Sequence, residues 1–300
     1  MQRVTGIGAT RAALAIGYVA VLLLAAPPVG AAGDAARGRV VFALAGGCGC
    51  HTSRDGPLGA GGGQVPTPFG TFYGTNITPD PDVGIGRWSD ADIDAAIRLG
   101  VARGKGVESP AMPYYQFAGM ADQDVTDLIA YLRALPPVAR PNRAHSGELP
   151  LARWAYRTWR WLFVRPVTPP RSAPTAGAAR GRYLVDHVSI CGDCHTPRNG
   201  FGVPDAARYL AGAAVGPGDD AVPNITPHAT GIGDWNVDDV VSLLTTGMQP
   251  NFDNVQGLMA DVIDGTGGGP GYKHAPERDV RAIAEYLITV PPIDNAVEAK

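Results

Sequence analysis

Cys191, Cys194 and His195 bring two thiols and an imidazole together at a spacing that could bind a prosthetic group. The run has the form C-x-x-C-H, in which two cysteines form thioethers with a haem c and the histidine binds its iron. A Cys-x-x-Cys redox pair and a zinc site are the alternatives. Neither of them explains the adjoining histidine. The spacing therefore predicts haem c attached at Cys191 and Cys194, with His195 as an axial iron ligand.

A shortened copy of this run lies at Cys48, Cys50 and His51. Cys50 stands directly before the histidine, as Cys194 does, but one residue is missing between the two cysteines. We expect a second haem c here, held through Cys50, with the thioether to Cys48 either strained or absent. An error in the sequence of this glycine-rich stretch is the alternative explanation.

The two runs belong to an internal repeat, which organises the whole chain. AARGRVVFALAGGC at 35–48 aligns with AARGRYLVDHVSIC at 178–191, at an offset of 143 residues. NITPDPDVGIGRW at 76–88 aligns with NITPHATGIGDW at 224–235, and DLIAYLRALPPV at 127–138 aligns with AIAEYLITVPPI at 282–293. The sequence therefore predicts two copies of one domain.

Each copy is expected to open and close with a helix, because apolar residues recur at helical spacing there and two prolines end each closing segment. Gly38 and Gly181 in the opening segments would allow the closing helices to approach closely, with Tyr131 and Tyr286 at the contact. Between the helices lie long loops rich in Gly and Pro. We expect an all-α fold with few strands.

Four segments follow from this reading. We expect a signal peptide or N-terminal anchor at 1–32, one domain at 33–138, a linker at 139–177 and a second domain at 178–300. The linker should contain a short helix rich in Trp and Arg. Such a helix could dock a partner or lie at a membrane surface, although packing across both domains is the simpler interpretation.

The N-terminal segment predicts export. Arg3 and Arg11 precede an apolar run at 12–26, and small residues follow, with cleavage plausible near Ala31 or Ala32. This run of ~15 residues is shorter than the ~20 that a membrane-spanning helix needs, which favours a cleaved leader over an anchor. In an oxidising compartment the four cysteines could instead form two disulfides, but the histidine after each pair favours haem.

The charge of the chain argues against nucleic acid as a partner. The formal net charge is −3, and loss of the two arginines of the leader takes it to −5. We see no other long apolar run, so the mature protein should be soluble.

Two methionines are candidates for the second axial position at the two irons. Met112 lies 24 residues after Trp88, and Met259 lies 24 residues after Trp235. Met120 and Met248 have no counterpart in the other copy. A lone methionine is usually core filler, but matched placement favours Met112 and Met259 as ligands.

Two further features recur in both copies. Residues 76–78 and 224–226 match the Asn-x-Thr glycosylation pattern, but their matched placement indicates a structural loop instead. Arg54 and Arg198 follow the two histidines at the same distance. They could meet haem propionates or face solvent.

Several segments together resemble a known family. These are PTPFGTFYGTNITPDPDVGIGRWSDADI at 66–93, AMPYY at 111–115, CGDCHTPRN at 191–199 and NITPHATGIGDW at 224–235. They are similar to the dihaem and trihaem cytochrome c subunits of periplasmic dehydrogenases that oxidise alcohols, aldehydes and sugar acids. The resemblance covers about residues 34 to 293.

The resemblance implies that each domain has the all-helical class I cytochrome c fold, with His51, Met112, His195 and Met259 as iron ligands. It also implies a partner dehydrogenase of the flavin, quinone or molybdenum type, and electron delivery to the quinone pool or a terminal oxidase. The chain departs from the family in its shortened first motif. No third copy of the repeat is seen, so we expect a shorter relay than in the trihaem subunits.

A periplasmic dihaem electron carrier is the main functional prediction, with membrane association through the N-terminal segment or a partner. The rival is a dihaem peroxidase, which needs one iron that can lose its distal ligand and a group that manages the proton of peroxide. The near-equivalence of the two copies argues against that division of labour. A haem-binding sensor is the third alternative, and no signalling module supports it.

Overall fold

The computed structural model describes residues 32–67, 70–146, 152–216 and 221–297, and the chain from Ala32 onward forms one compact unit. The expected signal peptide lies outside these residues, apart from Ala32. Within the described ranges, no helix combines the length and the apolar character needed to cross a membrane. The division into two domains stays a prediction, so the two repeats are called the first and second copy below.

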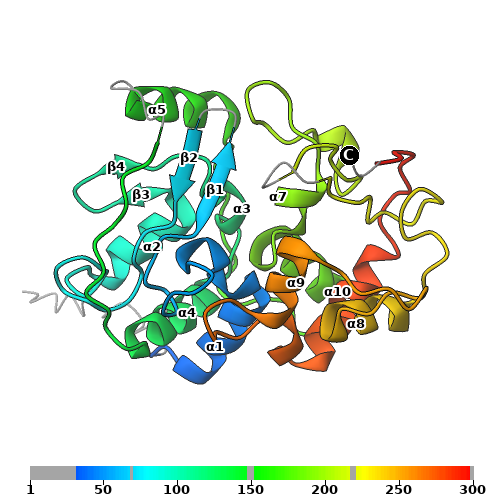
Figure 1. The fold of residues 1–300 in the computed structure, drawn as a ribbon, viewed down its shortest axis with the longest axis horizontal. Helices are drawn as coiled ribbons and strands as arrows, with labels where there is room; N and C mark the ends of the chain where they lie inside the picture. Colours follow the sequence, from blue (N-terminus) through cyan, green and yellow to red (C-terminus); the bar gives the residue numbers. More distant parts are fainter. Residues whose placement is uncertain (1–31, 68–69, 147–151, 217–220, 298–300) are drawn as a thin grey trace, which may run out of the picture. The chain divides into compact units, whose positions relative to one another are not determined.

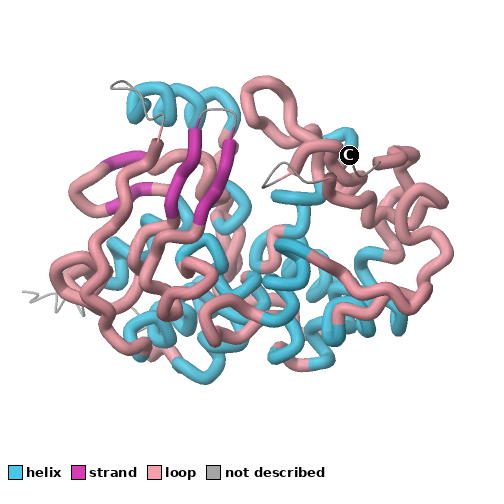
Figure 2. The backbone as a smooth tube through the Cα atoms, viewed as in Figure 1, coloured by secondary structure: helices cyan, strands magenta, loops and turns pink. Residues whose placement is uncertain are grey.

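Helices and loops make up most of the described structure (Figure 2). The helices are α1 (Ala35–Leu44), α2 (Asp90–Leu99), α3 (Tyr114–Phe117), α4 (Asp122–Ala134), α5 (Ala152–Phe163), α6 (Gly177–Tyr183), α7 (Cys191–His195), α8 (Val237–Thr246), α9 (Gly257–Asp264) and α10 (Glu277–Leu287). In each copy the opening helix packs against the closing one: α1 lies against α4 and α6 against α10 (Figure 1).

Two small antiparallel sheets modify the all-α prediction. β1 (Gln64–Thr67) pairs with β2 (Gly70–Tyr73), and β3 (Val101–Ala102) pairs with β4 (Gly106–Val107). Threonine, valine and aromatic residues in these segments favour extended backbone, and each hairpin is too short to give a periodic signal in the sequence. Both sheets lie in the first copy.

Gly38 and Gly181 bring the opening and closing helices into direct backbone contact, as predicted. A Cβ atom at Gly38 would stand 1.9 Å from a backbone oxygen of α4 and 2.8 Å from Cβ of Tyr131. A Cβ atom at Gly181 would stand 1.8 Å from a backbone oxygen of α10 and 2.7 Å from Cβ of Tyr286. The two tyrosines therefore lie at the helix crossing in both copies, which confirms their predicted position.

An arginine on each opening helix reinforces this crossing. Arg37 donates from Nε to Asp127 at 2.7 Å and from Nη2 to the same carboxylate at 3.0 Å. Arg180 donates from Nε to Asp279 at 3.0 Å. Both acceptor carboxylates are buried on the closing helices. A buried charge is stable only when it is paired, so these contacts fix how each helix pair is aligned.

The apolar core runs through both copies without a break. Phe42, Met120 and Leu184 are all fully buried within it. Between the copies, Tyr183 accepts a hydrogen bond from the Ala121 amide at 2.9 Å and donates to a carboxylate of α4 at 2.7 Å. Burial of Met120 in this core agrees with its interpretation as core filler.

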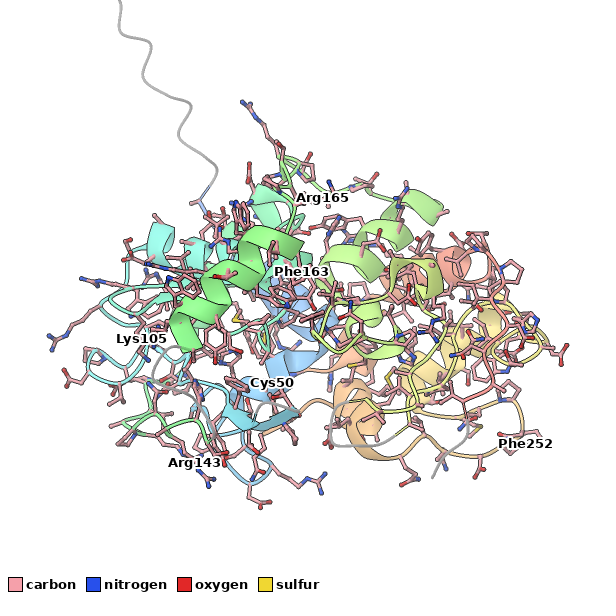
Figure 3. All side chains as sticks on the ribbon, turned by 90° about the horizontal axis from the view of Figure 1, so that it is seen from above. Cys50, Lys105, Arg143, Phe163, Arg165 and Phe252 are labelled. Carbon is pink, nitrogen blue, oxygen red and sulfur yellow. The ribbon has the colours of Figure 1, made fainter. Side chains whose placement is uncertain are left out.

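α5 packs across both copies, which was the simpler interpretation of the aromatic linker. Its inner face brings Tyr156 to 6.4 Å from Phe72 and Trp159 to 5.7 Å from Tyr115, measured between ring centroids. In the second copy, Trp159 Nε1 donates to the carbonyl of Phe201 at 2.8 Å. Figure 3 shows the helix from above, with its last residue, Phe163, labelled.

We predict that Gly38→Ala and Gly181→Ala each lower the free energy of unfolding by about 1–3 kcal/mol, because the added methyl group collides with backbone and the helices must separate. The measurement is guanidinium unfolding of the holoprotein followed by far-UV circular dichroism. Gly200→Ala is the matched control, since nothing lies within 4 Å of a Cβ there. Equal stability of all three variants would contradict the close-crossing interpretation.

Candidate haem centres

The second motif forms a single helical turn. α7 spans Cys191–His195, and it begins after Ile190, which adopts the left-handed conformation with φ of 45°. Both thiols are half-buried. None of the four cysteines of the chain forms a disulfide, so the disulfide alternative gains no support.

The first motif also ends in a cysteine followed by a histidine, but the backbone that leads to them is more strained. The turn η1 (Gly46–His51) contains three successive left-handed residues, Gly46, Gly47 and Cys48, with φ of 67°, 64° and 46°. In the repeat alignment Gly47 corresponds to Ile190, so Gly46 and Cys48 are the additional left-handed residues, and of these two only Cys48 has a Cβ atom. A residue with a Cβ atom pays about 1–2 kcal/mol for this conformation. The chain therefore adjusts to the missing residue at Gly46 and Cys48, and the strain falls on Cys48, while Cys50 keeps its place beside His51.

The two histidines are held by the same kind of hydrogen bond, and the ring nitrogen that this bond leaves free decides whether each site fits a haem. His51 Nδ1 donates to the carbonyl of Thr75 at 2.8 Å, and His195 Nδ1 donates to the carbonyl of Pro223 at 2.8 Å. Each bond fixes the tautomer and leaves Nε2 with its lone pair, as a metal-binding histidine requires. The residues present therefore fit an axial ligand in both copies.

Burial supports the same protonation state. It lowers the pKa of both His51 and His195, and the hydrogen bonds to the backbone carbonyls offset this only in part. A lowered pKa keeps an imidazole neutral at neutral pH. Only the neutral ring can donate an electron pair to iron.

The carbonyl that orients each histidine stands directly before an Asn-Ile-Thr loop. In the second copy, Asn224 Oδ1 accepts from the amide and hydroxyl of Thr226 at 2.9 and 2.8 Å. Asn224 Nδ2 donates to the carbonyl of Ile293 at 2.8 Å, beyond the closing helix. Asn76 makes the corresponding bonds in the first copy, to Thr78 and to the carbonyl of Val138. These side chains are buried, which confirms a structural loop.

The sequence interpretation missed two positioning residues that follow the histidines. Thr52 Oγ1 accepts from the Gly59 amide at 3.0 Å, and Thr196 Oγ1 accepts from the Leu210 amide at 3.1 Å. Both threonines are buried. Their matched place after each histidine was a signal that the repeat alignment contained, although hydroxyl contacts across a loop cannot be read from sequence.

The thiols do not resemble those of a redox pair. Burial raises the pKa of Cys191 to about 12 and that of Cys194 to about 12. A catalytic Cys-x-x-Cys motif needs the opposite shift, because the thiolate is the reactive form. Among the described residues, no group of three His, Cys, Asp or Glu side chains is arranged to hold a metal ion, so the zinc alternative gains no support.

The two predicted methionine ligands lie in different local structures. Met112 is half-buried in the turn before α3, whereas Met259 lies on α9 and packs against the core. Of the unmatched pair, Met120 is fully buried and Met248 is 42% exposed. The ligand roles of Met112 and Met259 therefore stay predictions.

The two attachment motifs are close enough for the charges of one to affect the thiols of the other. The charge of Asp193, in the second motif, contributes after burial to the raised pKa of Cys50 in the first. Cys50 in turn contributes to the raised pKa of Cys194, after burial and Asp193.

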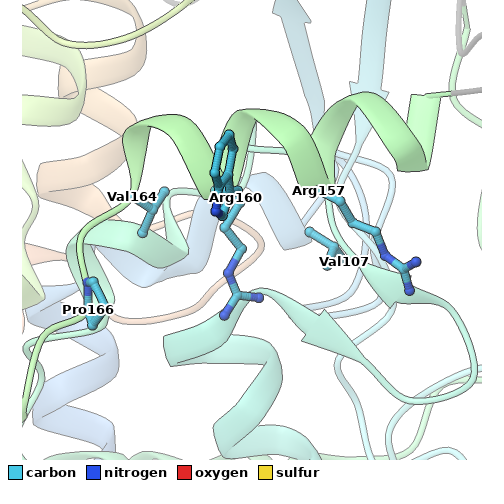
Figure 4. Close-up of a pocket in the computed structure, with 6 residues that line it drawn as sticks. Val107, Arg157, Arg160, Val164 and Pro166 are labelled. Carbon is cyan, nitrogen blue, oxygen red and sulfur yellow. The ribbon is translucent and has the colours of Figure 1, made fainter.

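A separate pocket lies beneath α5 and contains none of the predicted ligands (Figure 4). Its volume is about 420 Å³. It is lined by Val107, Arg157, Arg160, Trp161, Val164 and Pro166. Arg160 reaches from α5 toward the ring of Tyr114, with its guanidinium carbon 5.9 Å from the centroid. These contacts help to hold α5 on the first copy.

We predict that Asn224→Ala destabilises the protein by about 1–3 kcal/mol, because the buried Thr226 amide loses its acceptor and the Ile293 carbonyl keeps only the longer bond from the Thr226 hydroxyl, at 3.4 Å. The histidine carbonyl bond should loosen with the loop. Thermal unfolding of the holoprotein measures the loss, and Asn254→Ala, at an exposed position, is the control. A midpoint for Asn224→Ala equal to that of the control would exclude this role for the loop.

Comparison with known proteins places the chain among cytochromes. A family model for cytochrome c matches residues 35–136. A dihaem cytochrome c-type protein of Cereibacter sphaeroides is 40% identical over 272 residues, which covers 88% of this chain and 88% of the relative.

Two further relatives are subunits of dehydrogenases. The cytochrome c subunit of alcohol dehydrogenase (quinone) from Gluconobacter oxydans is 38% identical over 270 residues, or 86% of this chain and 55% of the relative. The cytochrome c subunit of gluconate 2-dehydrogenase from Pantoea cypripedii is 36% identical over 258 residues, or 82% of this chain and 57% of the relative. The chain thus spans about half the length of these two subunits.

The comparisons do not favour the peroxidase alternative, since these relatives are named as a dihaem cytochrome and as cytochrome c subunits of dehydrogenases. They agree with the two histidines whose Nε2 atoms are left free for iron. This chain therefore belongs to the cytochrome c family and resembles the cytochrome subunits of alcohol and sugar-acid dehydrogenases.

Proposed function

We propose that this chain is a periplasmic dihaem electron carrier that serves as the cytochrome subunit of a dehydrogenase. The observation that carries the proposal is the matched bond from His51 and His195 to a backbone carbonyl, each at 2.8 Å. One such histidine is compatible with a single haem site. Two, in equivalent loops of an internal repeat, support two haem sites.

Four side chains would ligate the two irons. His51 and Met112 would serve the first iron, and His195 and Met259 the second. When bound, haem c supplies a one-electron Fe(III)/Fe(II) couple, and a methionine ligand raises its reduction potential relative to a second histidine. With both axial positions filled, neither site would bind a substrate. The protein would then transfer electrons without catalysing an oxidation itself.

Attachment should differ between the two sites. Cys191 and Cys194 lie on one regular helical turn, which suits two thioethers. In the first copy the left-handed backbone at Cys48 argues that Cys50 carries the secure bond. We therefore propose one haem with two thioethers and one that depends mainly on Cys50.

The partner would be a dehydrogenase of the flavin, quinone or molybdenum type. Relatives named as subunits of quinone-dependent alcohol dehydrogenase and of gluconate 2-dehydrogenase support this class of partner. The downstream acceptor would belong to the respiratory chain. Export through the N-terminal leader would place the protein in the periplasm, and that segment or a partner could hold it at the inner membrane.

We predict that Met112→Ala and Met259→Ala each open one iron and lower its reduction potential, because the thioether ligand is lost. Spectra of the oxidised protein should lose part of the near-infrared methionine–iron band in each variant. Met248→Ala is the control, since that side chain is exposed and has no counterpart in the first copy. An unchanged band in either variant would refute that ligand assignment.

We predict that mass spectrometry of the mature protein shows two attached haems. Cys48→Ala should keep both, whereas Cys50→Ala should lose the first, because the strained backbone at Cys48 offers the weaker attachment. Cys191→Ala and Cys194→Ala make the equivalent changes in the regular second motif and serve as the comparison. A mass increment for a single haem in the unmodified protein would remove the first site from the proposal.

A further inference from the structure

A polar cluster joins the second attachment motif to the segment that follows Met112. Asp193 stands between the two cysteines of the second motif, and its Oδ1 accepts from Tyr115 Oη at 2.9 Å and from Gln116 Nε2 at 2.9 Å. Tyr115 and Gln116 belong to α3, which begins two residues after Met112. The second copy therefore binds the segment that directly follows Met112 in the first copy.

Arg198 closes the cluster. This residue lies three positions after His195, pairs with the carboxylate of Asp193 and donates from Nη1 to Tyr115 Oη at 3.0 Å. The side chains of Arg198 and Asp193 are only 31% and 21% exposed. Charge-assisted hydrogen bonds shielded in this way are stronger than those of surface pairs. Arg198 thus pairs with Asp193 and Tyr115 of its own chain, whereas the sequence had left open whether it meets a haem propionate or faces solvent.

The second copy also holds the backbone of α3. The carbonyl of Gln116 accepts from Nδ1 of His187, in the opening segment of the second copy, at 3.0 Å. Gly119 leaves room for this ring, since a Cβ there would stand 2.3 Å from the imidazole of His187. α3 has four residues and no side-chain cap at its start. A helix this short depends on outside contacts for its position.

A corresponding contact joins the first attachment motif to the helix that carries Met259. Arg54, three residues after His51, forms an ion pair with Asp261, two residues after Met259, at 3.5 Å. A Cβ at Gly46 would lie 3.5 Å from Val262 of α9, so η1 packs against the helix that carries Met259. Both charged groups are well exposed, with 78% and 41% of the side chains accessible. Exposed pairs of this kind contribute little, typically about 0–1 kcal/mol.

We propose that each attachment motif positions the methionine-bearing segment of the other copy, and that the cluster of Tyr115, Asp193 and Arg198 is the stronger of the two braces. Tyr115 and Asp193 are then positioning residues for Met112. The inference rests on the proposed role of Met112 as an iron ligand. It adds that the methionine ligation of the first site depends on the folded second motif, and it couples the two sites through protein contacts.

The test uses Tyr115→Phe and Asp193→Asn in the full holoprotein. Proton NMR of the reduced protein resolves the methyl group of each iron-bound methionine, and the Met112→Ala and Met259→Ala variants assign the two signals. Imidazole is then added to the oxidised protein to measure how fast each methionine is displaced. Loss of the Tyr115 hydrogen bond in Tyr115→Phe, or of the charge that pairs with Arg198 in Asp193→Asn, should speed displacement of Met112 by about tenfold and leave Met259 unchanged.

Asp205→Asn is the matched control. Asp205 is another carboxylate of the second copy, accepts from Arg208 Nε at 2.9 Å and caps the following turn, and its hydrogen bonds lie within its own copy. The control should leave both displacement rates unaltered. Arg54→Gln should change displacement of Met259 by less than the cluster variants change that of Met112, because the Arg54–Asp261 pair is exposed.

Two failures can be told apart. If Met112→Ala leaves both methyl signals in place, Met112 is not a ligand and the proposed function is wrong at that site. If the ligand is confirmed but Tyr115→Phe and Asp193→Asn leave the displacement rate of Met112 unchanged, the positioning proposal is overturned. Equal acceleration at both methionines would also overturn it, because that result indicates general loosening of the fold.

Discussion

The hydrogen bond between a histidine Nδ1 and the carbonyl that precedes an Asn-Ile-Thr loop is the constraint on which both candidate centres depend. His51 and His195 each make it, and each bond decides which ring nitrogen remains free. The loop itself is fixed because Asn76 and Asn224 reach the backbone after the closing helix. Ligand orientation is therefore tied to the far end of each repeat, 62 residues after Asn76 and 69 residues after Asn224.

The same logic explains why the helix crossings matter for the sites. The asparagine side chains bond to the backbone a few residues after each closing helix, at Val138 and Ile293, so a shift of α4 or α10 would disturb the loop that orients the histidine. Gly38 and Gly181 let the helices meet at backbone contact, and buried carboxylates pair with Arg37 and Arg180 across them. Stability and ligand geometry thus draw on one set of contacts, with the polar cluster around Asp193 linking the two copies.

Much of the fold and of the candidate sites could be predicted from the sequence, because the internal repeat allows one half of the chain to be compared with the other. The offset of the repeat identified Gly38 with Gly181 and Tyr131 with Tyr286 as contact residues, and it singled out Asn76 and Asn224 as structural. Each of these lies at a place where a side chain's size or hydrogen-bonding pattern leaves few alternatives. The two hairpins of the first copy escaped notice, since strands of two to four residues carry too little periodicity.

The amino-acid sequence by itself determined the haem motifs, the repeat and the helices that frame them, because these depend on local spacing and on residue type. Only the tertiary structure decided how the shortened motif is accommodated, at the left-handed Cys48, and which groups Arg54 and Arg198 meet. Those outcomes follow from contacts between segments far apart in the chain. Side chains with several possible partners choose among them only when packing has brought one partner within reach.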